Sequence, residues 1–205
     1  MAAELLVLLP VLALALTAGA AARAATVDVE VLGRDGKALA ESVVFLESPA
    51  AKAAARPQPG IEIEQADKRF TQRVTVVTVG SAIAFPNRDK VRHHVYSFSP
   101  TRFDLKLYIG TPANPVVFDK AGIAALGCNI HDTMLAWVVV VETAHHGLTG
   151  AGGRVRLADV PPGTYRLRSW HPDLPTGTPA LDQPLIVGPQ GASASVRLAL
   201  PGSPG

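Results

Sequence analysis

The segment from Cys128 to Met134 contains the only cysteine in the chain, and it places a thiolate, an imidazole and a thioether three residues apart, at Cys128, His131 and Met134. A soft sulfur ligand, a nitrogen ligand and a second, weaker sulfur ligand together suit copper, which changes between Cu(I) and Cu(II). Such a site needs one more imidazole from elsewhere in the chain. The pair His93-His94 is the best candidate to supply it.

Only one histidine of this pair should face the site, because adjacent residues on a strand point to opposite sides. Strand alternation does not decide between His93 and His94. A Cys-x-x-His pair also occurs in zinc sites and redox motifs, but a closed structural zinc site usually carries several cysteines, which this chain lacks. The donor set therefore favours a single copper ion.

Composition narrows the functional class. Lys and Arg number 19 against 17 for Asp and Glu, with no basic run that could follow a phosphate backbone, so nucleic acid is not an expected partner. Asp104, Asp119 and Asp132 are scattered, and no nucleophile stands with a base in an evident motif. The sequence therefore predicts a protein that is not an enzyme.

The first residues resemble an export signal. Residues 5–22 are apolar apart from breaks at Pro10 and Gly19, and Ala22-Arg23-Ala24 has the small residues that a signal peptidase recognises. We expect a signal peptide over residues 1–24, cleaved near Ala24, a periplasmic or secreted protein, and no stable membrane insertion after cleavage. Because residues 1–4 lack Lys and Arg, an uncleaved anchor or a misplaced start codon is the alternative. An exported chain with one cysteine cannot form an internal disulfide, which favours metal ligation by Cys128.

Short β-branched or aromatic runs, separated by Gly, Pro and Asp turns, predict an all-β fold. Residues 26–32 and 42–47, joined by an Asp35-Gly36 turn, are expected to form a hairpin. Residues 49–60 are Ala- and Pro-rich and are expected to be a linker or long loop, and no segment has a helical period over ten residues. The remaining predicted strands are 61–64, 73–79, 82–85, 94–98, 103–108, 116–118, 122–123, 134–141, 153–157, 159–168, 184–187 and 194–199.

Residues 61–142 resemble the cupredoxins, the blue copper proteins that include plastocyanin, amicyanin and proteins labelled methylamine-utilisation proteins. The matching features are Gly80 at the end of a Val-rich strand, Phe85-Pro-Asn87 with Asp89, the segment 93–95, Gly122, and the Cys128-x-x-His131-x-x-Met134 loop, which has the amicyanin spacing. The resemblance implies an antiparallel Greek-key sandwich. It also implies that His93, Cys128 and His131 are the three close copper ligands and that Met134 is a weak axial one.

Three positions depart from the cupredoxin pattern. His94 stands where the family usually has an Asn whose amide stiffens the ligand loop, so a coordinating role for His94 in place of His93 stays open. Asp132 introduces a charge where an apolar patch often surrounds the exposed imidazole. Leu126-Gly127 precede the cysteine where an aromatic residue often stands two places before it.

The two ends of the chain resemble the carboxypeptidase-regulatory or transthyretin-like sandwich, through residues 29–45 and residues 152–167, which contain the run Val-Pro-Pro-Gly-Thr-Tyr. We expect residues 26–48 and 144–200 to form this second sandwich, with the copper domain, 61–142, inserted between an entry at 49–60 and an exit at 143–150. The alternative is a single sandwich extended by the flanks. A weaker second copper site at His145-His146 is a further hypothesis, against solvated loop histidines; His171 is also in the flanks.

These expectations combine into one prediction. The chain is an exported protein with one type 1-like copper ion, and it carries single electrons between redox protein partners, with His131 as the exit route. A periplasmic copper carrier or storage protein is the first alternative, favoured by Asp132 and His94. A β-sandwich binding module without a redox role is the second.

Overall fold

The computed structural model describes residues 24–201 and consists almost entirely of β-strands, so the predicted all-β fold class is confirmed. The predicted export signal lies outside the described residues except for its last one. No helix in the described part of the chain is long and apolar enough to cross a membrane.

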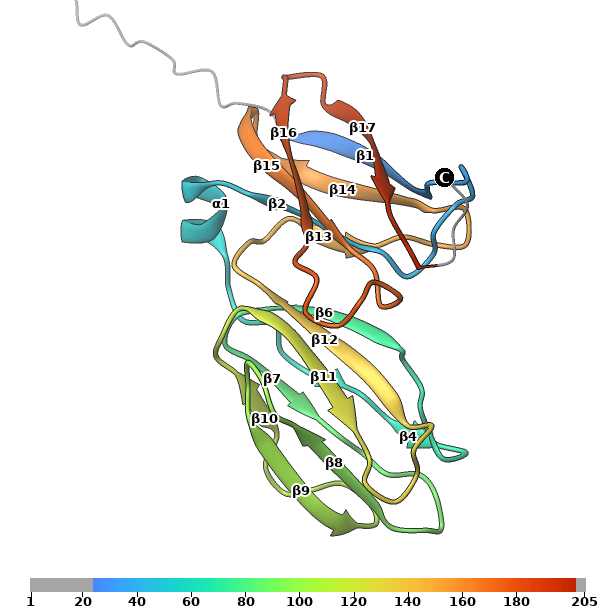
Figure 1. Ribbon diagram of the computed structural model, residues 1–205. Helices are drawn as coiled ribbons and strands as arrows, with labels where there is room; N and C mark the ends of the chain where they lie inside the picture. Colours follow the sequence, from blue (N-terminus) through green and yellow to red (C-terminus); the bar gives the residue numbers. More distant parts are fainter. Residues whose placement is uncertain (1–23, 202–205) are drawn as a thin grey trace, which may run out of the picture.

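Strands from the two ends of the chain form two sheets, which we call the flanking unit. One sheet contains β14 (Arg154–Val160), β1 (Ala25–Gly33) and β17 (Ala192–Leu198), and the other contains β13 (His146–Leu148), β2 (Val43–Glu47), β15 (Gly163–Trp170) and β16 (Leu181–Val187). Figure 1 shows these blue, orange and red strands gathered in the upper half of the molecule.

Strands from residues 61–141 form three other sheets, which we call the central unit, green and yellow in the lower half of Figure 1. Its five-stranded sheet contains β6 (Val74–Thr78), β12 (Leu135–Val141), β11 (Gly122–Gly127), β8 (His93–Ser97) and β9 (Phe103–Tyr108). A second sheet contains β10 (Val116–Phe118), β7 (Ser81–Ala84) and β3 (Ile61–Glu62), and β4 (Gln65–Ala66) pairs with β5 (Arg69–Phe70). The pairings are not all antiparallel as predicted, because β12 pairs in parallel with β6 and β3 with β7.

The predicted hairpin between residues 26–32 and 42–47 is wrong. The turn forms, with Gly36 at φ 77°, but β1 pairs with β14 and β17 whereas β2 pairs with β13 and β15 in the opposite sheet. The physical reason lies in burial. Val27, Val29 and Val31 of β1 and Val44 and Leu46 of β2 belong to one apolar core, which two strands cover better from opposite sheets than side by side.

The outer face of β2 is buried as well, because the flanking unit packs on the central unit. Val43 and Phe45 of β2 and Trp170 of β15 form an apolar cluster with Val139 and Val141 of β12. Polar contacts surround this cluster. Arg73 forms ion pairs with Glu41 and Asp173 of the flanking part of the chain, and its guanidinium lies 5.3 Å from the ring centre of Trp137.

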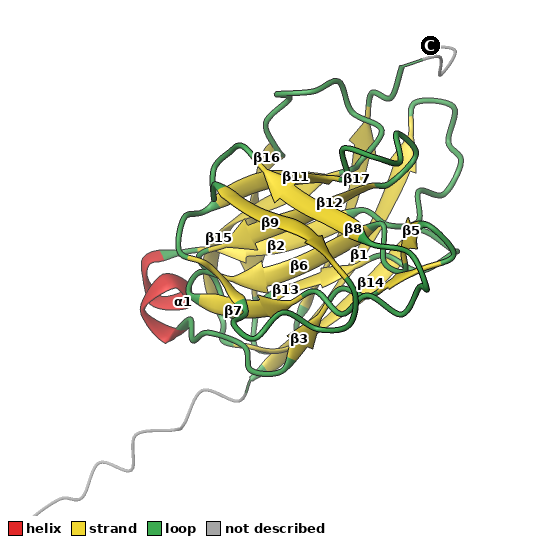
Figure 2. Ribbon diagram, turned by 90° about the horizontal axis from the view of Figure 1, so that it is seen from below, coloured by secondary structure: helices red, strands yellow, loops and turns green. Residues whose placement is uncertain are grey.

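Two segments expected to be loops contain regular structure. Pro49–Ala54 forms a six-residue helix, α1, which lies at the edge of the molecule in Figure 2. The helix is too short for a hydrophobic period to be detected, and its start is fixed by capping. The Ser48 hydroxyl accepts the Ala51 N–H at 3.1 Å and a proline occupies the first turn. The predicted exit loop contains β13, which pairs with β2.

We expect the flanking unit to lose stability as the pH falls below about 6.5, the ordinary pKa of histidine. Burial lowers the pKa of His145, His146 and His171. His171 donates its Nε2–H to the Ala40 carbonyl at 3.0 Å and accepts the Asp173 N–H at Nδ1, and this pair of bonds requires the neutral ring. The unfolded chain therefore binds protons first, so the stabilisation is complete above about pH 6.5 and is lost below it.

Urea unfolding of the metal-free protein at about pH 7.5 and about pH 5.5, on either side of the ordinary histidine pKa, measures this effect. Replacing all three histidines by glutamine should reduce the difference between the two free energies of unfolding. An unchanged difference would assign the pH dependence to other groups.

Candidate metal centre

His93 is the first residue of β8 and points into the central unit. Burial alternates along this strand, so His93 and Val95 are fully buried while His94 and Tyr96 are on the other face. The His94 Nε2 contacts the carboxylate of Asp104 on the neighbouring strand β9, and the His94 ring lies 5.3 Å from the Tyr96 ring. The structure thus places His93 inside and His94 outside.

The loop from Cys128 to Met134 connects β11 to β12, which pair with each other along their whole length. The Met134 N–H donates to the His131 carbonyl at 2.9 Å and closes the loop into a tight turn. Cys128 and Met134 are 4% and 2% exposed and belong to the apolar core of the central unit. His131 is half-buried and is therefore more exposed than Cys128 and Met134.

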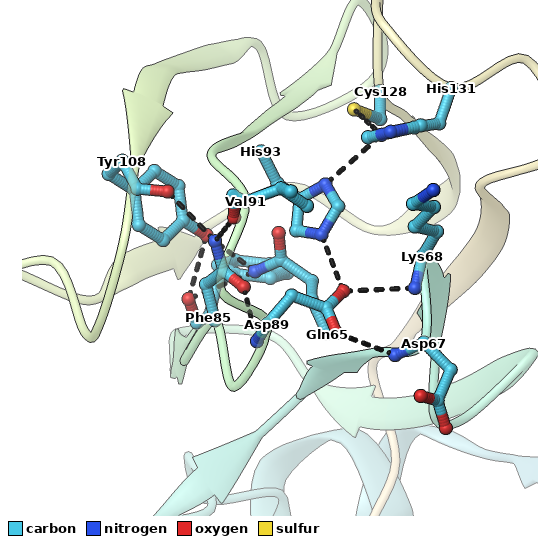
Figure 3. A network of polar contacts seen from close by, with 11 residues as sticks. Gln65, Asp67, Lys68, Phe85, Asp89, Val91, His93, Tyr108, Cys128 and His131 are labelled. Atoms are coloured by element: carbon cyan, nitrogen blue, oxygen red, sulfur yellow. Dashed lines mark hydrogen bonds and ion pairs between the residues drawn. The ribbon is translucent and has the colours of Figure 1, made fainter.

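His93, Cys128 and His131 converge on one point (Figure 3). The two histidine Nδ1 atoms are 3.2 Å apart, and the Cys128 Sγ lies 3.8 Å from the His131 Nδ1. Two nitrogen ligands that are each about 2.0 Å from one metal ion lie roughly 3 to 3.5 Å apart. The arrangement therefore fits a small metal ion bound by two imidazoles and one thiolate, with the Met134 thioether in the same loop, and this donor set is the one that copper prefers.

The far side of the His93 ring has its own partner. Its Nε2 lies 2.7 Å from the carboxylate of Asp89, whose pKa is lowered mainly by the hydrogen bond with His93. Asp89 belongs to the loop 85–92 between β7 and β8. The sequence motif contains Asp89, but its spacing from His93 did not predict this contact.

A buried polar network holds that loop in place (Figure 3). The Asn87 amide donates to the carbonyls of Val91 and Tyr108, and the buried Gln65 amide donates to the Tyr108 hydroxyl at 2.6 Å. The Tyr108 hydroxyl donates in turn to the Phe85 carbonyl, and burial raises the pKa of Tyr108 to about 12. Neither Gln65 nor Tyr108 was predicted, because a buried polar contact between distant strands leaves no periodic pattern in the sequence.

The departures from the cupredoxin pattern have visible consequences here. Gly127 pairs with Tyr96, and a Cβ on Gly127 would lie 2.8 Å from atoms of the Tyr96 ring, so an aromatic side chain from β8 covers the residue before the cysteine. Asp132 is exposed beside His131, but so is the apolar Ile130. The surface around the imidazole is therefore mixed rather than purely polar.

The flanking histidines contact other groups, and a weaker copper site at His145-His146 stays a prediction. His146 lies 3.4 Å from the Thr78 hydroxyl, His145 packs edge-on against Tyr165, and His171 is bonded to Ala40. Among residues 24–201, the His93, Cys128 and His131 group is the one place where three such ligands converge.

Comparison with known proteins gave similarity to solved structures only. No protein-family model matches the chain, and no curated protein matches it. The reduced Cu(I) form of one amicyanin mutant is 21% identical, with a TM-score of 0.37, and the match covers 48% of this chain and 98% of the amicyanin chain. The oxidised state of another amicyanin mutant is 23% identical, with a TM-score of 0.36, and the match covers 48% of this chain and 98% of the amicyanin chain. A purple cupredoxin from Nitrosopumilus maritimus is 17% identical, with a TM-score of 0.36, and the match covers 40% of this chain and 100% of the cupredoxin chain. Cupredoxins are thus among the solved structures to which this chain is similar, as its motifs predicted.

Proposed function

We propose that this chain is an exported mononuclear copper protein that carries single electrons between redox protein partners. The observation that carries the proposal is the convergence of the His93 and His131 Nδ1 atoms and the Cys128 thiol at one end of a buried core. A copper ion held there would accept one electron and return it. The proposal also includes two further statements about the protein: it is exported, and it carries electrons rather than acting as an enzyme.

The protein contributes rigidity and exclusion of water. His93, Cys128 and Met134 are buried. β8, which carries His93, and β11 and β12, which flank the loop from Cys128 to Met134, belong to one sheet. Ligands held in this way move little when the charge of the site changes, which favours fast electron exchange.

His131 is the proposed route to the partner, because it is the half-exposed ligand of the group. Exposed apolar side chains occur in the loops at this end of the unit, at Val91, Ile109 and Ile130, and offer contact area for a second protein. The charged Asp132 stands at the same surface and would favour a transient complex over a permanent one.

A copper carrier or storage protein is the second candidate. The exposure of His131 and its neighbour Asp132 favours it, because a half-open ligand can pass the metal to another protein. The two functions differ in the redox behaviour of the loaded protein. A carrier binds copper without an intense visible band, whereas an electron carrier shows a thiolate-to-copper band that bleaches with ascorbate and returns on oxidation. Absence of stoichiometric copper binding would contradict both.

The two adjacent histidines provide a matched pair of variants for this test. We expect His93→Ala to lose the visible band, because it removes a buried ligand, and His94→Ala to keep it, because the His94 ring faces Asp104 on the other side of the strand. Absorption spectra of both variants after loading with Cu(II) measure the difference. Loss of the band in His94→Ala alone would reverse the ligand assignment.

A further inference from the structure

The hairpin of β4 and β5 is closed by an unusual turn. Gln65 pairs with Phe70 and Ala66 with Arg69, which leaves Asp67 and Lys68 as a two-residue loop with φ values of 52° and 56°. Positive φ at both central residues defines a type I′ turn, for which Asn-Gly is the preferred sequence. Aspartate tolerates positive φ as asparagine does, but lysine rarely adopts it, so Lys68 carries backbone strain that contacts elsewhere must offset.

Those contacts converge on one carboxylate. The Asp67 N–H donates to the Asp89 Oδ1 at 2.8 Å, and the Lys68 N–H donates to the Asp89 Oδ2 at 2.9 Å. Successive backbone N–H groups that point into one concavity form an anion-binding nest. Because each N–H takes a different oxygen, the plane of the carboxylate is fixed as well as its position.

The same carboxylate faces His93. Asp89 Oδ2 also accepts the His93 Nε2–H at 2.7 Å, while the Asp89 N–H donates to the Asn87 side chain at 2.9 Å (Figure 3). A neutral imidazole carries one proton, so a ring that donates from Nε2 has an unprotonated Nδ1. That Nδ1 is the atom that points toward Cys128 and His131.

We propose that Asp89, held by the Asp67-Lys68 turn, is the positioning residue that prepares His93 as an Nδ1 ligand before any metal binds. The role given to Asp89 rests on the proposed copper function. The contact between Asp89 and His93 itself is argued only from the hydrogen bonds of these residues. Carboxylates that accept from a ligating histidine fix its tautomer and orientation, and their loss typically lowers metal affinity by about 10- to 100-fold.

The first test uses metal-free protein and nitrogen-15 NMR of the histidine rings. We expect the wild-type His93 to be the Nε2–H tautomer with a slowly exchanging ring proton, and Asp89→Asn to lose this slow exchange. Asp89→Glu, which restores a carboxylate, should recover part of it. A wild-type His93 ring protonated at Nδ1 would overturn the proposal.

The second test loads the same variants with Cu(II). Asp89→Asn should bind copper about 10- to 100-fold more weakly and show a shifted reduction potential. The matched control is Asp119→Asn, an exposed carboxylate between β10 and β11, which should leave the His93 tautomer and the affinity near the wild-type values. Unchanged affinity and potential in Asp89→Asn would refute the positioning role.

A turn variant keeps the proposal testable if Asp89→Asn does not fold. Replacing Asp67-Lys68 by Asn-Gly keeps both N–H donors and removes the strain, so the protein should become more stable with an unchanged His93 tautomer. A changed tautomer would show that the two side chains, rather than the backbone nest, hold Asp89. If the wild type has the expected tautomer but binds no copper, the proposed function fails while the inferred contact stands.

Discussion

Cys128→Ser abolishes the intense visible band of the copper-loaded protein, and this is the largest spectroscopic effect we expect from any single substitution. The band requires a thiolate bonded to Cu(II), and a serine hydroxyl is neither ionised at neutral pH nor a soft ligand. The exchange is nearly isosteric, and Cys128 is 4% exposed in a well-packed core, so the variant should fold and retain its two histidines. Absorption spectra and copper stoichiometry of the two loaded proteins measure the effect.

Met134→Leu is the matched control for this substitution. It replaces a buried thioether in the same loop by a side chain of similar volume, and a thioether in the proposed weak axial position is not the source of the band. The control should therefore keep an intense band with a changed reduction potential. A band that survives in Cys128→Ser would show that the copper binds elsewhere.

Trp170→Ala is expected to cost about 3–5 kcal/mol of unfolding free energy, the usual range for removing a buried large aromatic side chain. The indole is 4% exposed in the cluster between the flanking and central units, and its ring centre lies 6.3 Å from that of Trp137. Its loss leaves a cavity at the contact of the two units, so both should unfold at a lower urea concentration. Tryptophan fluorescence and circular dichroism of the metal-free protein follow the transition.

Ile186→Ala provides the comparison on the neighbouring strand β16. Ile186 is 77% exposed, so its truncation should change the stability by no more than about 0.5 kcal/mol. A cost below about 1 kcal/mol for Trp170→Ala would mean that the contact between the units contributes little in solution. Two separate unfolding transitions in the wild type would lead to the same conclusion.

Several features were predictable because they depend on neighbouring residues in the chain. Alternation of apolar residues predicted nearly every strand, including Phe103–Tyr108 with both its ends. The turn at Asp35-Gly36 followed from the residues that tolerate positive φ. Sulfur, imidazole and thioether three residues apart pointed to copper before any fold was known, since donor chemistry is a property of the side chains.

Other features were not predictable from local sequence. Pairing of β1 with β17 rather than with β2 depends on which sheet each strand joins around the core that all three share, and residues 27–33 and 192–198 are far apart in the chain. Four consecutive buried residues in β2 concealed the fact that its two faces serve two different cores. Helix α1 is too short to show a period.

The features of the candidate metal centre also separate into those predictable from the sequence and those that were not. By itself, the sequence determined the kinds of candidate ligand and placed three of them, Cys128, His131 and Met134, in one short loop, because they are close together in the chain. Only the tertiary structure decided that His93 rather than His94 faces Cys128 and His131. The sequence alternation of residues 93–98 was compatible with either histidine pointing inward. The tertiary structure also decided that Asp89 lies between His93 and the Asp67-Lys68 turn. The bonds from the turn to Asp89 join residues more than 20 positions apart, so they depend on how the sheets pack.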